Sequence, residues 1–387
     1  MGAAGERGPG RAGPERPARR RRGGCPGRGP GRSDHRGPGG RGRPGARARL
    51  RHPARVPRPR VARPGAGPGG SDRRPDRDIA GSPAGVTRVA LVLNPALPRS
   101  GAAREAVAAA CAGAGLEQPL LLRTSVAQVG AAQARKALAA GADRILVAGG
   151  DGTVRAVAGA LRARQDVVLG VVPVGTANLF ARGLGLPTRD LGRAAHLAVT
   201  GPALPVDLGW AELTNHTGAS TEHPFLVVVG LGHDADAVAA LHPALKRRLR
   251  WLAYFEPGLR RLARPGRPVT FSLDGEVEST EQLWSILAVS SARLPGGARL
   301  VPGARPDDGL LHVVLVAPRR LTDWARVART GLSGRHTPHP ALRYRQGCRL
   351  TVRPSEPALV QVDGDVMVDI VRAHIEIRPG ALRVACP

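Results

Sequence analysis

Two apolar segments, each followed by a glycine- and threonine-rich loop and then by a helical pattern, constrain this sequence most. Residues 145–148 lead into the loop GGDGT (149–153), and residues 167–172 lead into PVGTAN (173–178). Glycine lets a backbone approach phosphate closely, and the N-terminus of the following helix favours negative charge. Two tight turns in an α/β sheet are the alternative. Because two such loops occur close together, both with threonine and one with aspartate, we expect a phosphate-binding site.

The surrounding pattern indicates an α/β domain over residues 86–205. Strands are predicted at 89–93, 120–122, 145–148 and 167–172, and helices at 102–112, 127–139, 153–161, 178–183 and 191–199. This alternation is typical of a doubly wound, Rossmann-like parallel sheet, in which ligand loops follow the carboxyl ends of strands. Both glycine loops, and Asn94-Pro95 after the first strand, occupy such positions.

The pattern changes after residue 205, where short strand-like segments are separated by turn signals such as Asp274-Gly275 and Asp363-Gly364. This spacing favours an antiparallel β-sandwich domain over residues 206–387, whose last segment packs back on the first domain. The predicted strands cover residues 206–210, 225–229, 269–273, 284–289, 311–316, 349–352, 359–362 and 374–377.

Residues 1–85 contain 22 arginines and six acidic residues, so that they carry +16 of the total net charge of +28. This Arg/Gly/Pro-rich segment lacks the apolar residues that a folded core needs, and we expect it to be disordered. It could tether the chain to anionic partners, or it could be untranslated sequence upstream of a native start near Val86. Its residue types use GC-rich codons, which indicates a high-GC bacterium. The four cysteines have no metal-ligand spacing, and no apolar run reaches transmembrane length.

Residues 241–264 combine leucines and aromatic residues with six arginines and one lysine. A basic helix of this kind can lie on an anionic membrane. Packing of its apolar face against the β-sandwich is an equal alternative.

Together these elements resemble the diacylglycerol kinase catalytic domain family, which includes bacterial lipid kinases and sphingosine kinases. The resemblance runs from about residue 89 to residue 383 and keeps the family's order of motifs. The matching segments are Asn94-Pro95 with Ser100-Gly101, GGDGT at 149–153, PVGTAN at 173–178, GLGHDA at 230–235, LAY at 252–254, PGA at 302–304 with DDGL at 307–310, and VDGD at 362–365.

The resemblance implies an ATP-dependent lipid kinase with its active site in the cleft between a nucleotide-binding domain and a lipid-binding β-sandwich. Asp365 would be the general base on the lipid hydroxyl, and Asp151 would act beside the transferred phosphate. Asp308, with the backbone carbonyls of Arg305 and Leu310, would hold Mg²⁺. The residues implied for nucleotide binding are Asn94, Thr124, Gly149, Gly150, Asp151, Gly152, Thr153, Gly175, Thr176 and Asn178.

Three residues depart from the family pattern. Asp365 stands where the family has glutamate and is one methylene shorter, which reduces the reach of a base. Leu179 replaces a common aspartate, and His233 replaces a usual aromatic residue, where we expect it to pack rather than to catalyse.

Three other functions would explain part of this sequence. An NAD kinase shares GGDGT but does not explain PVGTAN, Asp308 or Asp365, and a weakened relative could bind nucleotide or lipid without turnover. A nucleic-acid-binding protein would rest on the arginine-rich tail alone, so no specific nucleic acid is expected. We expect a cytoplasmic enzyme of phospholipid metabolism, peripheral at the anionic inner face of the membrane. The lipid acceptor and the oligomeric state, including a homodimer, stay open.

Overall fold

The computed structural model describes residues 87–239, 264–291, 301, 303–333 and 339–387. These residues belong to one compact unit. The predicted tail, the alternative start near Val86 and residues 241–263 of the predicted basic helix lie outside the described residues.

The first part of the chain forms a parallel sheet with the strand order β2-β1-β3-β4. Nearly every residue of β1, β3 and β4 is buried, as expected for parallel strands covered on both faces. In this order β2 and β3 lie on opposite sides of β1. The carboxyl ends of β1 and β3 therefore mark a topological switch point, where such sheets bind ligands. The strands are β1 (Val89–Leu93), β2 (Leu120–Arg123), β3 (Arg144–Gly149) and β4 (Val168–Pro173).

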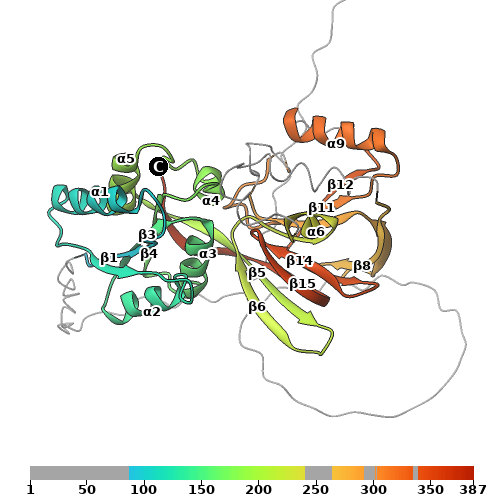
Figure 1. Cartoon of the computed structure of the whole chain (residues 1–387), viewed down its shortest axis with the longest axis horizontal. Coiled ribbons are helices and arrows are strands. Elements are labelled where there is room, and N and C mark those ends of the chain that lie inside the picture. Colours follow the sequence, from blue (N-terminus) through green and yellow to red (C-terminus); the bar gives the residue numbers. More distant parts are fainter. Residues whose placement is uncertain (1–86, 240–263, 292–300, 302, 334–338) are drawn as a thin grey trace, which may run out of the picture. The chain divides into compact units, whose positions relative to one another are not determined.

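Helices cover both faces of this sheet (Figure 1). Helices α1 (Ser100–Gly113) and α5 (Leu191–Thr200) pack together on one face, whereas α2 (Ala131–Ala139) and α3 (Asp151–Ala160) pack together on the other. Helix α2 begins later than predicted. Before it, Gln128 donates its N–H to the Ser125 hydroxyl at 3.2 Å, and Gly130 has φ 149°, so a turn replaces the first helical turn.

The second part of the chain is antiparallel and rich in strands. One path of neighbours runs β12-β11-β10-β7-β14-β15, and β15 continues through β13 and β8 to β9. Its elements are β5 (Ala203–Asn215), β6 (Ser220–Phe225), β7 (Val228–Gly232), β8 (Arg267–Leu273), β9 (Ser279–Leu283), β10 (Ser285–Val289), β11 (Leu311–Val316), β12 (Leu342–Gly347), β13 (Arg349–Pro354), β14 (Ala358–Val362) and β15 (Asp365–Ala385), with helices α6 (His233–Ala239) and α9 (Leu321–Ser333). The short helix α4 (Leu179–Gly183) belongs to the first part, between β4 and α5.

The predicted fold class, a doubly wound α/β part followed by an antiparallel β-rich part, is confirmed. The sequence did not reveal β6, β9 and β12. These strands are short, have sequences such as STEHPF and STEQL, and pair along one side only in the described sheet. Polar edge strands lack the apolar alternation on which the prediction relied.

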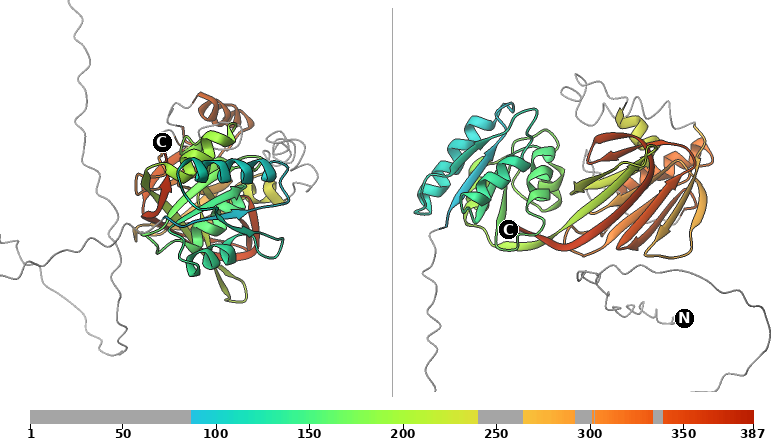
Figure 2. Two further views of the ribbon diagram at one scale, coloured as in Figure 1. Left: turned by 90° about the vertical axis from the view of Figure 1, so that its left-hand side faces the viewer. Right: turned by 90° about the horizontal axis from the view of Figure 1, so that it is seen from below.

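The longest strand, β15, connects the two parts of the fold (Figure 2). Its first half pairs with β14 and β13, and Arg383 and Val384 at its far end run parallel to β4. An irregularity in its pairing with β5 falls between Arg378 and Leu382, around Pro379-Gly380. This bend lets one strand extend the antiparallel sheet and then the parallel one.

A continuous apolar core follows the same route. Phe180 of α4, Leu208 of β5 and Leu226 belong to one buried cluster with residues of the parallel sheet. A second cluster fills the β-rich part, and a third lies beneath α1 and α5. Burying a side chain such as Phe180 stabilises a fold by about 1.5–3 kcal/mol. None of the helices in the described ranges is both long and apolar enough to cross a membrane.

Candidate active site

The predicted nucleotide residues gather where the parallel strands end. The N–H of Asn94, just after β1, donates to the Ala148 carbonyl of β3 at 3.0 Å. The N–H of Thr124, just after β2, donates to the Leu93 carbonyl at 2.8 Å. These bonds continue the sheet ladder into the loops, so the loops after three strands share one edge at the switch point.

The two glycine loops touch through their backbones. A Cβ added to Gly175 would lie 2.5 Å from the Gly150 Cα and 2.8 Å from Asn178 Oδ1. A Cβ on Gly149 would lie 2.7 Å from the Thr153 Cβ. Real side chains do not tolerate such distances, so Gly149 and Gly175 are required for the loops to pack. The site is therefore two backbone loops in contact at the N-terminal ends of α3 and α4.

Asn178 shapes the second loop. It adopts the left-handed conformation, with φ 49°, and its Nδ2 donates to the Gly175 carbonyl at 2.8 Å. Its side chain is largely buried, whereas Thr176 beside it is exposed. In the first loop Gly152 is exposed and Thr153 is buried. The groups most accessible to a ligand are therefore Thr176 and the backbone around Gly152.

Asp151 connects the two helices that follow these loops. It is the first residue of α3, and its Oδ1 accepts the N–H of Phe180 in α4 at 3.2 Å. Burial raises the pKa of the Asp151 carboxyl, and the N–H groups of Phe180, Leu179 and Asn178 oppose that rise. The carboxylate thus holds the N-terminus of α4 against α3, in addition to any part it takes in phosphate transfer.

The turn Asp363-Gly364-Asp365, which we call the DGD turn, leads into β15 and is fixed by several hydrogen bonds. The buried Asp363 carboxylate accepts the N–H groups of Leu226, Val227 and Val228 at 2.7, 3.0 and 2.9 Å. These three donors interrupt what was predicted as one strand over residues 225–229; the structure has the end of β6, a break and the start of β7 there. The N–H of Gly364 donates to Gln361 Oε1 at 2.9 Å. Burial raises the pKa of Asp363 to about 6.

Asp365, the predicted base, is exposed and forms an ion pair with Arg155 of α3. Arg155 also donates to the Val362 carbonyl, so one guanidinium binds both ends of the turn. Because α3 begins in the first glycine loop, Arg155 connects the predicted base to the predicted phosphate site.

A second buried carboxylate, Asp234 of α6, lies beneath the same turn. Ser285 donates its hydroxyl to Asp234 Oδ1, while Oδ2 has no hydrogen-bond partner among the described residues. Burial raises the pKa of Asp234 to about 6, against hydrogen bonding from Ser285, the Ala235 N–H and Gln361. Gln361 therefore connects Asp234 with the DGD turn, through its effect on Asp234 and its bond to Gly364.

His233, the residue before Asp234, is buried and packs as expected. Its Nδ1 lies 2.9 Å from Asp236 Oδ2 and its Nε2 lies 3.1 Å from the Pro265 carbonyl oxygen. Its ring lies 5.6 Å from that of Trp284. Both ring nitrogens are therefore engaged in hydrogen bonds within the protein.

Asp308 belongs to a separate, hydrogen-bonded loop. Its carboxylate accepts the N–H groups of Arg305 and Leu310, each at 3.1 Å, and lies 2.9 Å from His312 Nε2. Nearby, Asp207 of β5 accepts the N–H groups of Gly309 and Gly380 at 2.7 and 2.8 Å. Asp308 thus contacts the N–H groups of the residues whose carbonyls were predicted to bind Mg²⁺.

Within the described part of the chain, no three His, Cys, Asp or Glu residues are grouped so as to hold a metal ion. Mg²⁺ prefers an octahedron of oxygen ligands and usually retains several waters. The loop offers it two carboxylates. Both oxygens of Asp308 already accept N–H groups, and Asp307, the alternative ligand if the loop shifts, is paired with Arg305. Mg²⁺ at Asp308, Arg305 and Leu310 stays a prediction.

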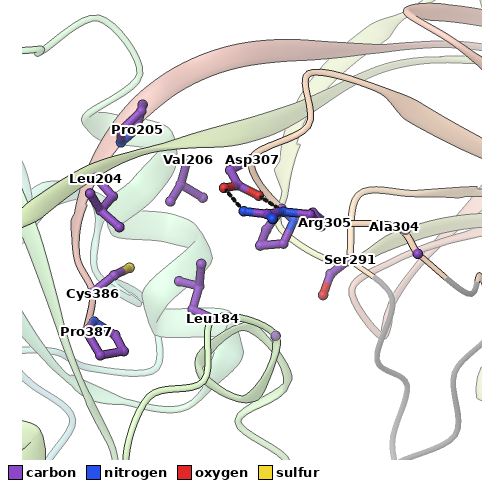
Figure 3. Close-up of a pocket in the computed structure, with 13 residues that line it drawn as sticks. Leu184, Leu204, Pro205, Val206, Ser291, Ala304, Arg305, Asp307, Cys386 and Pro387 are labelled. Carbon is purple, nitrogen blue, oxygen red and sulfur yellow. Dashed lines mark hydrogen bonds and ion pairs between the residues drawn. The ribbon is translucent and has the colours of Figure 1, made fainter. Parts of the chain in front are cut away.

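A cavity of about 410 Å³ opens beside this loop (Figure 3). Leu184 and Val206 line one side of it, and Arg305 and Asp307 form an ion pair of 2.6 Å on the other. None of the predicted nucleotide residues lines this cavity. It is therefore distinct from the site at the glycine loops.

The sequence did not single out Arg155, Gln361 or Asp207. Arg155 follows GGDGT by two residues, which was the only signal that could have suggested it. Asp234 was noticed only as part of the GLGHDA segment.

Comparisons with known proteins agree with this geometry. The family model of the diacylglycerol kinase catalytic domain matches residues 88–211. The model of the YegS C-terminal NAD kinase beta sandwich-like domain matches residues 227–386. The fold and the paired glycine loops thus define a kinase with a β-sandwich C-terminal part.

Relatives identify the family. The diacylglycerol kinase of Bacillus subtilis is 30% identical over 226 residues, which cover 58% of this chain and 71% of that protein. The diacylglycerol kinase of Mycobacterium tuberculosis is 32% identical over 260 residues, which cover 65% of this chain and 79% of that protein. The chain belongs to the diacylglycerol kinase family of lipid kinases.

A solved structure shares the fold. The crystal structure of a diacylglycerol kinase from Bacillus anthracis superposes with a TM-score of 0.58 at 20% identity, covering 78% of this chain and 97% of that one.

Proposed function

We propose that this protein transfers the γ-phosphate of ATP to the hydroxyl group of a lipid such as diacylglycerol or a sphingoid base. The observation that carries the proposal is the connection between the two glycine loops and Asp365. The loops meet at Gly150 and Gly175, and α3, which starts in the first loop, reaches Asp365 through Arg155.

The reaction needs phosphate binding, orientation and removal of one proton. The backbone of the glycine loops and the Thr176 hydroxyl would hold the nucleotide phosphates. Asp365 would accept the proton of the lipid hydroxyl while the oxygen of that hydroxyl forms a bond to the γ-phosphorus. The bond from that phosphorus to the β–γ bridging oxygen breaks, and ADP leaves. Mg²⁺ bound to ATP would neutralise phosphate charge in this chemistry.

Arg155 forms an ion pair with Asp365 and so holds its carboxylate in one orientation beside α3. The same pairing also supports a second candidate, a relative that binds nucleotide without turnover, because Arg155 would then compete with the substrate for Asp365.

An assay with γ-labelled ATP and Mg²⁺ tests the proposal on the full chain. The acceptors are diacylglycerol, phosphatidylglycerol and a sphingoid base in mixed micelles, with NAD as a separate acceptor. We expect label in one lipid, and a loss of about 100-fold or more in Asp365→Asn. The matched control is Asp369→Asn, an exposed aspartate on the same strand.

Two other results are informative. Transfer of label to NAD would replace the lipid kinase by an NAD kinase. Binding of ATP without transfer to any acceptor would favour the weakened relative.

We also infer that the protein works as a peripheral protein at an anionic membrane surface on the cytoplasmic side, where a long-chain acceptor would reside. Residues 86–387 carry a net charge of +12, the difference between +28 for the chain and +16 for residues 1–85. Sedimentation with vesicles should increase with the fraction of anionic lipid and decrease with salt. Equal binding to neutral and anionic vesicles would contradict this inference.

A further inference from the structure

A second cavity, of about 300 Å³, lies beside α3. Helices α2 and α3 and strands β5 and β6 surround it, and none of the predicted nucleotide residues lines it. The lining side chains with polar or aromatic groups are Arg135, Arg155, Arg162, Trp210 and His223. We call it the Arg135–Arg162 cavity.

The charge of this cavity is positive and incompletely neutralised. No carboxylate lines it. Arg155 is paired with Asp365, which lies outside the lining. Arg135 and Arg162 form no ion pair with any residue in the described ranges, and the one hydrogen bond of Arg162 goes to the Gly159 carbonyl at 3.5 Å. Two guanidinium groups are thus available to an anion.

Trp210 adds a second, independent feature. The residue is 7% exposed, and the buried Nε1–H has no hydrogen-bond acceptor in the described structure. Buried N–H donors without partners are rare and costly in native proteins. The donor belongs to a residue that lines the cavity.

The arginines around Trp210 are held in place. The guanidinium carbons of Arg162 and Arg378 lie 4.8 and 4.3 Å from the centre of the Trp210 ring, in cation–π contact. Arg378 is paired with Glu376 at 2.9 Å, whereas Arg162 is paired with no carboxylate of the described residues. The ring therefore orients Arg162 without neutralising its charge.

His223 does not supply the charge of the cavity. Burial lowers its pKa, and the charge of Arg155 lowers it further, against the opposing effect of Asp365. Its Nε2 lies 2.9 Å from the Thr221 hydroxyl oxygen. A neutral imidazole beside three arginines is an additional hydrogen-bonding group for a polar ligand.

We propose that the Arg135–Arg162 cavity binds the phosphate group of a small phosphate ester. Guanidinium groups match phosphate oxygens in pairs, and this preference is stronger for arginine than for lysine. The volume is at the lower end of ligand pockets, which fits one phosphorylated headgroup rather than a whole nucleotide. Because Arg155 borders the cavity and also holds Asp365, a bound phosphate competes with Asp365 for that guanidinium. Phosphate binding does not depend on the proposed kinase activity.

The test is calorimetric titration of the full chain with glycerol 3-phosphate, in the presence of a saturating, non-hydrolysable ATP analogue that blocks the glycine loops. We expect one site, and a loss of affinity of about tenfold or more in the double variant Arg135→Gln/Arg162→Gln. The matched control is Arg104→Gln, an exposed arginine of α1 far from the cavity lining. Unchanged affinity in the double variant, or no binding to the unmodified protein, would overturn the proposal.

Two further arms separate the sources of the phosphate and guard against misfolding. Sedimentation with phosphatidylcholine vesicles, with and without phosphatidic acid, tests a lipid headgroup; binding that depends on phosphatidic acid and on both arginines assigns the phosphate to a membrane lipid. Binding of soluble glycerol 3-phosphate alone assigns it to a free ester. If the double variant has a lowered Tm, Arg135→Gln alone, which changes an exposed residue of α2, gives the same comparison.

Discussion

Arg155 of α3 and Asp365 of β15 form an ion pair between residues 210 positions apart in the sequence. The side chain of Arg155 is 15% exposed and that of Asp365 is 61% exposed. A largely buried arginine therefore fixes the direction of an accessible carboxylate. The position of Asp365 depends on the helix that starts in the first glycine loop.

Replacing Arg155 should separate binding from turnover. In Arg155→Gln, Asp365 loses its partner, and we expect kcat to fall roughly 10- to 100-fold with little change in nucleotide affinity, because a base that is displaced acts poorly. Steady-state kinetics and nucleotide titration measure the two quantities. Arg164→Gln breaks the exposed Arg164–Asp166 pair and serves as the control. An unchanged kcat in Arg155→Gln would show that the pair does not position a base.

Asp151 should affect both stability and activity, and two substitutions separate these effects. Asp151→Ala removes the acceptor at the N-terminus of α4 and should lower the free energy of unfolding by about 1–2 kcal/mol. Asp151→Asn keeps a side-chain oxygen, so it should retain stability and still lose phosphate transfer. Asp190→Ala removes the cap of α5, whose Oδ1 accepts the Arg193 N–H at 3.0 Å, and should lower stability without affecting the chemistry. Full activity in Asp151→Asn would exclude a catalytic part for the charge.

The contact between the glycine loops predicts a strong effect of one methyl group. In Gly175→Ala the new Cβ would collide with Gly150, forcing the loops apart, so we expect roughly 1–3 kcal/mol of lost stability and weaker ATP binding. Gly101→Ala on α1 meets nothing within 4 Å and is the control. Thermal unfolding with and without an ATP analogue measures both effects. If Gly175→Ala bound ATP normally, the backbone contact would not define the nucleotide site.

The Asp308 loop gives a direct test of the metal prediction. If hydrogen bonds alone hold the loop, neither Mg²⁺ nor EDTA should change the Tm of the nucleotide-free protein. Asp308→Ala should then cost roughly 2–3 kcal/mol, because three hydrogen bonds are lost. A Tm that rises with Mg²⁺ in the unmodified protein, and does not in Asp308→Ala, would instead establish the Mg²⁺ site.

Asp234 predicts an unusual dependence of stability on pH. Its pKa in the folded protein is about 6, above the ordinary value of 3.8. The folded state therefore holds this proton more tightly, and stability should decrease by roughly 2–3 kcal/mol as the pH rises from 3.8 through 6. Asp234→Asn should make that slope smaller but not remove it, because the pKa of Asp363 is also about 6. Urea unfolding at several pH values measures the slope, with Asp190→Asn as the control; an unchanged slope in Asp234→Asn would contradict the prediction.

Local sequence patterns were sufficient for the α/β part and for the glycine loops. Each predicted strand there combines a short apolar segment with a loop that ends it, so its position follows from neighbouring residues. The break at Leu226 and Val227 could not be predicted in this way. Those residues are apolar and suit a strand, and it is the Asp363 carboxylate, distant in sequence, that takes their N–H groups.

The same limit applies to the site. Asn178 and Gly175 are recognisable because their own segment requires them. Arg155 and Asp234 are ordinary in sequence and gain their importance from Asp365, Ser285 and Gln361, which belong to other strands. Only the tertiary structure places these residues together.

The long strand β15 has a consequence for synthesis on the ribosome. Strand β4 is made early, but its partner residues Arg383 and Val384 are made more than 200 residues later, as the separation from Val168 and Leu169 shows. During synthesis the edge of β4 that pairs with β15 therefore stays unpaired until the far end of β15 has left the exit tunnel. Pairings this distant in sequence fold slowly, because a long loop must close before they form. A nascent chain stalled before residue 383 should consequently be recognised by chaperones and cut readily by proteases.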